Sequence, residues 1–461
     1  MADLLLVASM CACSLAGALA GFCAGLVPGL HMNNIAAGMT AYSGAVLAAF
    51  GIVSGVLGSD GPALLISCFI SAALVGHMFA QGITSTYLGI PSEDVVSVLP
   101  AHRLARAGLG EAAVRASADG TLFGIVVSVI LLLPMCLIMG APVGLYHLLG
   151  EVMGFIIAGF SVVLLCSEGQ GQLGSERPVA VARAASLFLA SGVMGTVVLC
   201  TDYCSCGMPD LLLSGRGFVM RSSLLLPMFA GLFGIPGLVL GLRSSQVMDC
   251  PASSERSHSH APSGMDLVVS VLGGILVGWM PGMTSGSAAT VCAPSVREHS
   301  DGTDVRGSAR FIWLYSSISG AGAVSAVGAL FIISRARSGC MDAAQFFLGD
   351  AVQPGMLGQD IVPMAAVVLS MVIAAWVGHL MVSSLNSRLH RLRPVLCSAR
   401  VAIMSLAFVC ALSFALTGTR GALVMATAAC LGLLAPLAGV RRIQLMGCLL
   451  VPIMLGFFGL V

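Results

Sequence analysis

The sequence predicts an all-α polytopic membrane protein built from two related halves. Three observations lead to this fold class. Hydrophobic residues make up 57% of the 461 residues and charged residues only 9%, whereas a soluble domain carries roughly a quarter charged residues. Apolar stretches of about 20 residues, the length that crosses a bilayer, recur along the chain. A Pro-Gly motif followed by small or polar residues occurs twice, at Pro28-Gly29 and Pro281-Gly282.

The apolar segments leave no room for a large soluble domain. They predict roughly 10 to 13 membrane segments, some of them broken or re-entrant at the Pro-Gly motifs. The first segment has no basic region before it and no clear cleavage site, so we interpret it as a membrane helix and not as a cleaved signal. The segments lie near residues 4–27, 35–58, 62–80, 120–140, 152–166, 179–200, 223–242, 265–279, 309–334, 361–385, 400–417, 421–438 and 443–460.

Glycine is abundant, with 57 residues, which is typical of closely packed membrane helices. Gly17, Gly21 and Gly25 recur every four residues and therefore share one face of the first helix. Such a face fits packing within the chain as well as it fits dimerisation.

A polar linker separates the two predicted halves. We assign residues 1–245 to an N-terminal half, residues 246–261 to the linker and residues 262–461 to a C-terminal half. The linker is rich in Ser, and we interpret its His258 and His260 as parts of a solvated loop, not as metal ligands. We expect no metal site in this chain.

Arg-rich loops predict the orientation, because loops rich in basic residues stay in the cytoplasm. Arg residues cluster in loops 386–400 and 440–443, while Asp350 and Asp360 fall one span earlier, on the opposite side. Both Arg loops are therefore predicted to be cytoplasmic and the C-terminus external. Loop 101–118 is also basic, yet an odd number of apolar segments separates it from loop 386–400. Either one of these segments is re-entrant or split, or one of the two loops is assigned to the wrong side of the membrane.

Two matches in the same order indicate an internal duplication. Residues 27–37 resemble residues 280–290, and each of these copies follows an apolar, Gly-rich span. Further along, residues 106–113 resemble residues 337–344. Repeats are a common way to build transporters, with the substrate site between the halves.

The paired Pro-Gly motifs predict a substrate site. Pro removes a backbone donor and Gly allows unusual turns, so together they break a helix. The helix that starts after the break presents free N–H groups and its positive dipole end, which attract anions. The alternative is a kinked helix in which the polar residues only cap. The predicted substrate-binding residues at the breaks are Pro28, Gly29, Asn33, Asn34, Pro281, Gly282, Thr284, Ser285 and Ser287.

A third polar cluster, residues 81–94, predicts a re-entrant or unwound element. We add Thr84 and Ser85 from this cluster to the substrate-binding residues. Glu93 and Asp94 are predicted to bind a coupling ion, because acidic residues at membrane depth are usually functional. The alternative places both acids at the water interface.

At these motifs the sequence resembles the TctA family, the large permease subunit of tripartite tricarboxylate transporters. Besides the two Pro-Gly motifs, the matching features are Gly89-Ile90-Pro91, residues 102–108, Glu111-Ala112-Ala113 and residues 119–124. There are departures: the family usually has Pro-Gly where this chain has Pro91-Ser92, and smaller residues where it has His31, Asn33 and Asn34. They indicate a divergent branch, for which citrate-like specificity does not follow from the resemblance.

We therefore expect a multi-pass permease of the cell membrane that carries an organic anion, with a carboxylate as the first expectation, driven by an ion gradient. The only cofactor expected is a coupling proton or sodium ion. The resemblance implies two partners, a small membrane subunit and an extracytoplasmic binding protein. A net charge of +1 argues against a nucleic-acid partner.

Two other functions are weighed against this one. A lipid-phosphate carrier is the main alternative, because polyprenyl-phosphate transporters resemble this chain in their paired re-entrant segments, and the basic residues here are all Arg. An enzyme is not expected, since the chain has no His-Glu-x-x-His and no Gly-x-Ser-x-Gly motif. His77 and His379 lie in apolar spans, where we interpret them as isolated packing residues.

Overall fold

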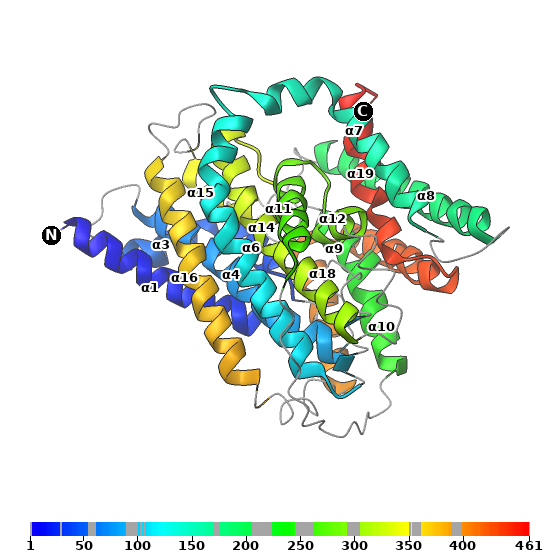
Figure 1. Ribbon diagram of the computed structural model, residues 1–461, viewed down its shortest axis with the longest axis horizontal. Helices are drawn as coiled ribbons and strands as arrows, with labels where there is room; N and C mark the ends of the chain where they lie inside the picture. Colours follow the sequence, from blue (N-terminus) through cyan, green and yellow to red (C-terminus); the bar gives the residue numbers. More distant parts are fainter. Residues whose placement is uncertain are drawn as a thin grey trace.

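The computed structural model is all-helical in the part of the chain that it describes (Figure 1). The described residues are 2–27, 30–53, 61–88, 100–101, 104–105, 107–168, 176–204, 224–244, 262–292, 305–349, 352, 361–386, 388 and 399–460. The predicted linker, residues 246–261, lies outside them.

The elements follow one another along the chain in this order. The first are α1 (Ala2–Gly25), α2 (Met32–Ala41), α3 (Ser43–Val53), α4 (Gly61–Leu88), α6 (Gly110–Met139), α7 (Leu145–Cys166) and α8 (Glu176–Cys204). Next come α9 (Leu225–Phe229), the π-helical η2 (Ala230–Gly234), α10 (Ile235–Ser244), α11 (Gly264–Trp279), α12 (Ser285–Cys292), α14 (Val305–Ile333) and α15 (Gly339–Leu348). The last are α16 (Ile361–Asn386), α18 (Ala399–Leu437), the 3₁₀ helix η4 (Arg442–Met446) and α19 (Gly447–Phe457).

Eight of the described helices are long and apolar enough to cross a membrane. Three shorter apolar helical stretches, Leu225–Leu240, Gly264–Trp279 and Arg442–Phe457, accompany them. The predicted segment 35–58 contains two short helices, α2 and α3, neither of which has the length of a span. The chain is thus a multi-pass membrane protein in which several apolar segments are interrupted.

Two of these spans, α4 and α14, form the centre of the molecule. Within their most apolar windows, 72% of the α4 residues and 78% of the α14 residues are buried, against at most 44% in any other candidate span. Each therefore meets neighbouring helices on most of its circumference, whereas the other spans keep a broad face for lipid.

The helices α1, α4 and α16 form a first group. Gly17 lies against Phe69 and Gly21 against Ala73, so α1 and α4 run in the same direction with their backbones in contact. This resolves the role of the glycine face in α1, which packs within the chain. Helix α16 packs on α4 as well, where Gly378 meets Phe79.

The helices α6, α11 and α14 form a second group. Gly120 and Gly124 of α6 lie against the backbone of Trp313 and Ser317, so α6 and α14 run in the same direction. Helix α11 packs on the same helix through Gly278 and its neighbours. Both groups are thus built on seams in which glycine lets two backbones touch.

The two groups run in opposite directions. Asn386 near the end of α16 donates to the carbonyl of Glu111 at the start of α6, and Gly82 of α4 meets Ser117 of α6. Helix α6, from the N-terminal half, packs on α14, and α16, from the C-terminal half, packs on α4. Inverted-topology repeats likewise place corresponding helices in opposite directions. Superposition of the halves stays a prediction.

The end of α16 lies beside the start of α6, because the Asn386 side chain donates to the Glu111 carbonyl. Most of the basic residues of loops 101–118 and 386–400 lie outside the described residues. Which face of the membrane this end occupies stays a prediction.

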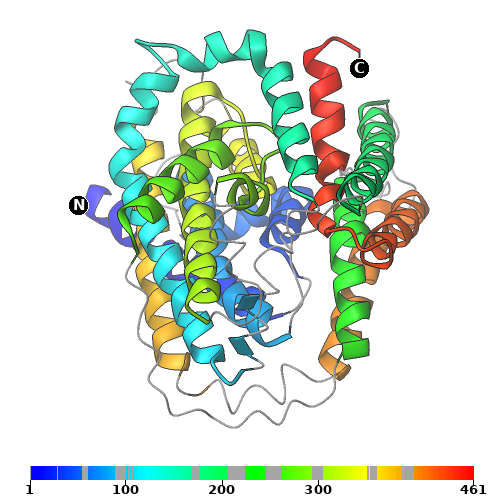
Figure 2. The same ribbon diagram turned by 45° about the vertical axis from the view of Figure 1, so that its right-hand side comes forward.

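The remaining long helices, α7, α8 and α18, form a second core with the short helices α9, η2, η4 and α19. Figures 1 and 2 show α8 and α19 on the side of the molecule away from α1 and α16. Helix α18 is interrupted at Gly418, whose φ of 63° is not helical, as the separate segments 400–417 and 421–438 predict.

Candidate functional site

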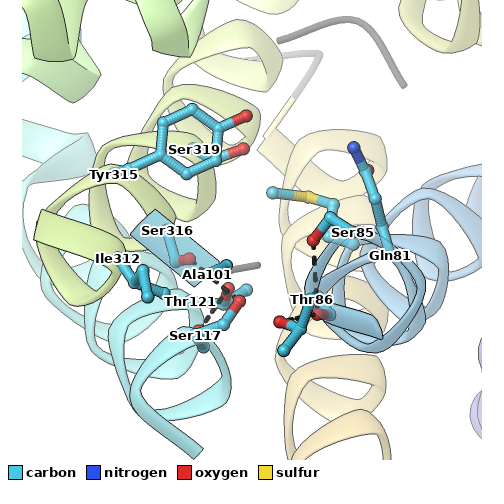
Figure 3. Close-up of a pocket in the computed structure, with 12 residues that line it drawn as sticks. Gln81, Ser85, Thr86, Ala101, Ser117, Thr121, Ile312, Tyr315, Ser316 and Ser319 are labelled. Atoms are coloured by element: carbon cyan, nitrogen blue, oxygen red, sulfur yellow. Dashed lines mark hydrogen bonds between the residues drawn. The ribbon is translucent and has the colours of Figure 1, made fainter. Parts of the chain in front are cut away.

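A cavity lies between α4 of the first group and α6 and α14 of the second. It is small, with room for only about 40 Å³ of solvent, and part of it is open to solvent. In Figure 3, Gln81, Ser85 and Thr86 of α4 face side chains of α6 and α14 across it.

The lining is mostly polar and, among the described residues, uncharged. Seven hydroxyl groups and one amide surround the space, contributed by Gln81, Ser85, Thr86, Ser117, Thr121, Tyr315, Ser316 and Ser319. The apolar part consists of Met78, Gly82, Ala101 and Ile312. Hydroxyl and amide groups both donate hydrogen bonds, so the cavity can bind a polar or anionic solute.

Hydrogen bonds fix several of these side chains. The hydroxyls of Ser117 and Ser316 are 2.9 Å apart and join α6 to α14. Thr121 donates to the carbonyl of Ser117, one turn earlier, over 2.9 Å. On the opposite wall Ser85 donates to the carbonyl of Gly82 over 3.2 Å.

Close packing of α4 against α6 limits the cavity on one side. A methyl group on Gly82 would stand 2.6 Å from the Ser117 hydroxyl, so only glycine lets α4 approach α6 this closely. Ala101 and Leu104 pack with Ala113 and Ile312, which closes the space beside the start of α6.

The first Pro-Gly motif lies where α1 ends and α2 begins, although Pro28 and Gly29 themselves are outside the described residues. The backbone around this break is held by side chains. His77 Nε2 donates to the Leu30 carbonyl over 2.9 Å, and Thr84 donates to the Gly25 carbonyl over 3.3 Å. Thr84 therefore supports the end of α1 and does not line the cavity.

Asn33 connects the first break to the C-terminal half. Its Oδ1 accepts from the backbone N–H of Cys340 over 3.1 Å, in the first turn of α15. The backbone N–H of Asn33 donates to Nδ1 of His31, so that the His31 side chain caps α2. The backbone N–H of the half-buried Asn34 donates to the His31 carbonyl.

The second Pro-Gly motif joins α11 to α12. Gly282 has a φ of +75°, a conformation that other residues resist, and Pro281 is buried. Thr284 and Ser287 cap α12 reciprocally, since the N–H of Thr284 donates to Ser287 Oγ and the N–H of Ser287 donates to Thr284 Oγ1. The half-buried Ser285 begins the helix.

Of the predicted substrate-binding residues, Ser85 alone lines the cavity among those that the structure describes. The others described are at the two helix breaks, where several act as caps. The predicted coupling residues Glu93 and Asp94 lie outside the described residues. Sequence reasoning missed the walls of α6 and α14, although the spacing of four between Ser117 and Thr121 marks a shared polar face.

The interpretation of His379 as an isolated residue is wrong. Its Nε2 lies 2.9 Å from Oδ1 of Asp119, on α6. The sequence does not reveal this pair, because the two residues are 260 positions apart and meet only when α6 and α16 pack together.

Comparisons with known proteins agree with this architecture. The model of the tripartite tricarboxylate transporter TctA family matches residues 11–447, nearly the whole chain. An uncharacterized protein of Methanocaldococcus jannaschii is 28% identical over 241 residues, which are 51% of this chain and 50% of that protein. The chain thus spans about half the length of this curated relative. No solved structure matches the chain.

Proposed function

Because the chain belongs to the tripartite tricarboxylate transporter TctA family, we propose that it is the large permease subunit of such a system in the cell membrane. Its cargo in this proposal is an organic anion with one or more carboxylates, and an ion gradient drives the transport. A small membrane subunit and an extracytoplasmic binding protein complete the system.

The cavity between α4, α6 and α14 is the observation that carries this proposal. It lies between two groups of helices that run in opposite directions, where a relative movement of the groups changes access to it. Its hydroxyl and amide groups can solvate a carboxylate without a cation in the lining. A site without a cation in its described lining also lets the anion leave again, as transport requires.

The Pro-Gly breaks have a second role in this proposal. Thr284, Ser287 and Asn33 already make capping hydrogen bonds, so their groups are engaged in holding helix ends. We propose that the breaks shape the two helix groups and that the anion binds in the cavity and not at the breaks. Glu93 and Asp94 remain candidates for coupling.

A binding measurement on the purified protein tests the substrate class. Radiolabelled citrate is expected to bind saturably, and unlabelled tricarboxylates and dicarboxylates are expected to displace it, because the chain belongs to a tricarboxylate transporter family and its cavity is lined by polar, uncharged groups. Inorganic phosphate is the matched anion control and is expected to displace little. Binding of a polyprenyl phosphate in place of every carboxylate would contradict the proposal and favour a lipid-phosphate carrier.

A further inference from the structure

We propose that the Asp119–His379 pair is the site that binds the coupling proton. This inference deepens the proposed function and rests on it, since it names the ion that drives the anion and the residues that hold that ion. It is carried by the position of the pair between the two helix groups and by the chemistry of its two side chains.

The pair lies where α6 and α16 pack together, with His379 in the apolar segment 361–385 and Asp119 directly before the apolar segment 120–140. Asp119 is nine residues into α6, about 14 Å along the helix from its start. His379 is seven residues before the end of α16, about 10 Å along that helix. The side chains of His379 and Asp119 are 24% and 43% exposed, so protons can reach them. His379 lies within an apolar span, where an ionisable residue is costly and usually functional.

The pair joins the two groups of helices. His379 belongs to the first group and Asp119 to the second, and the ring of His379 also meets the edge of Phe79 on α4. The α1–α4 and α6–α14 contacts are backbone seams at glycine, which resist sliding, while α16 meets α4 through the ring of Phe79 at Gly378. Between the groups, the polar contacts Asn386–Glu111 and Asp119–His379 accompany shared apolar packing and contain no such backbone seam.

Substrate and proton are therefore placed at one boundary. Ser117 and Thr121, two residues before and after Asp119 on α6, line the cavity. Because side chains four apart share a helix face, these two point to the cavity while Asp119 points to α16. A movement of α6 relative to the first group would change both sites together, which is the requirement for coupling.

The two side chains suit a proton better than a sodium ion. A carboxylate and an imidazole can share one proton, and such chains serve as proton relays in transporters. Hard cations require several oxygen ligands, and imidazole nitrogen is not a ligand they select. Among the described residues no cluster of three or more His, Cys, Asp or Glu side chains occurs that would hold a metal ion.

Protonation changes the strength of the link between the groups. With one added proton, His379 is an imidazolium and the pair is an ion pair that holds α6 to α16. When the proton leaves, a weaker hydrogen bond from the neutral ring remains. One proton thus enters from one side of the membrane, stabilises the closed pair and leaves on the other side after the groups have moved.

Other ionisable groups nearby do not replace either partner. Among the described residues, Asp119 and His379 have only each other as hydrogen-bond partners. Helix α16 carries no further charged residue. Among the described side chains, the ionisable groups of the elements packed around the pair are Glu111, Arg115 and Cys136 on α6, Cys68, His77 and Tyr87 on α4, Arg310 and Tyr315 on α14, and Cys11, Cys13 and Cys23 on α1.

The test separates exchange from uphill transport in proteoliposomes with radiolabelled citrate. Asp119→Asn and His379→Gln are expected to retain citrate exchange, which needs no proton gradient, and to lose both accumulation against a gradient and the accompanying acidification of an internal pH dye. Glu111→Gln, which neutralises an exposed carboxylate on the same helix, is the matched control and is expected to accumulate citrate normally. Accumulation by both pair variants at the wild-type level would overturn the proposal.

A second readout does not depend on citrate. Infrared difference spectra of the wild-type protein between low and high pH should contain an imidazolium band that His379→Gln removes and a shifted carboxylate band that Asp119→Asn removes. An unchanged spectrum in both variants would overturn proton binding at the pair. If the wild-type protein neither binds nor exchanges any carboxylate, the proposed function fails, while the spectra still decide whether the pair binds a proton.

Discussion

At the scale of single residues, charged side chains that are buried in this protein have identifiable partners. Glu168, at the end of α7, is only 5% exposed and accepts from the Nε and the backbone N–H of Arg441 and from the amide of Gln444. Arg441 also donates to the carbonyl of Ser167. This cluster ties α7 to η4 and leaves the carboxylate with three donors.

Removing the charge of Glu168 should destabilise the protein. Glu168→Gln leaves the Arg441 guanidinium partly buried without its counter-ion, and breaking such a pair costs about 3 kcal/mol. Thermal unfolding of the detergent-solubilised protein is expected to begin at a clearly lower temperature than in wild type. Glu151→Gln, an exposed position on the same helix, is the control. Equal unfolding temperatures for the two variants would show that the cluster contributes little.

The sequence predicts residue roles well only where the role is local. The special turn at Gly282 could be expected from Pro281-Gly282, and its positive φ agrees with that. The partner of His379 could not, because no local pattern connects positions 119 and 379. The roles of Asn33 and Thr84 as caps of distant elements are likewise set by tertiary contacts.

At the scale of elements, glycine seams determine which helices pair. An added methyl group at Gly21 would stand 1.9 Å from the carbonyl oxygen of Ala73, so any side chain there forces α1 away from α4. The spacing of four in α1 predicts a seam from the sequence, but it does not say which helix lies on the other side.

A substitution in this seam should disrupt folding far more than the same change elsewhere. Gly21→Leu is expected to lower the yield of monodisperse protein in size-exclusion chromatography, because both the clash and the lost backbone contact act on the central helix. Gly159→Leu in α7 is the matched control, since no atom lies within 4 Å of a methyl group placed there. Similar profiles for the two variants would mean that α1 is not held to α4 by this seam.

At the scale of the whole molecule, the two helix groups are the feature that sequence reasoning did not reach. Composition predicts an all-α membrane protein, and the paired motifs predict two related halves. The exchange that packs α6 on α14 and α16 on α4 depends on contacts between residues about 200 positions apart, such as Ser117 with Ser316. The cavity exists only because of this exchange, so neither half contains it alone.

In the proposed transporter the substrate binds in this cavity and not at the helix breaks. In a background without native cysteines, Ser85→Cys reports on the cavity and Ser285→Cys, equally half-buried, reports on the second break. Citrate, or whichever carboxylate binds best, is expected to slow modification of Ser85→Cys by a small thiol reagent and to leave Ser285→Cys unaffected. Protection of Ser285→Cys with none at Ser85→Cys would contradict the account and place the anion at the Pro-Gly break.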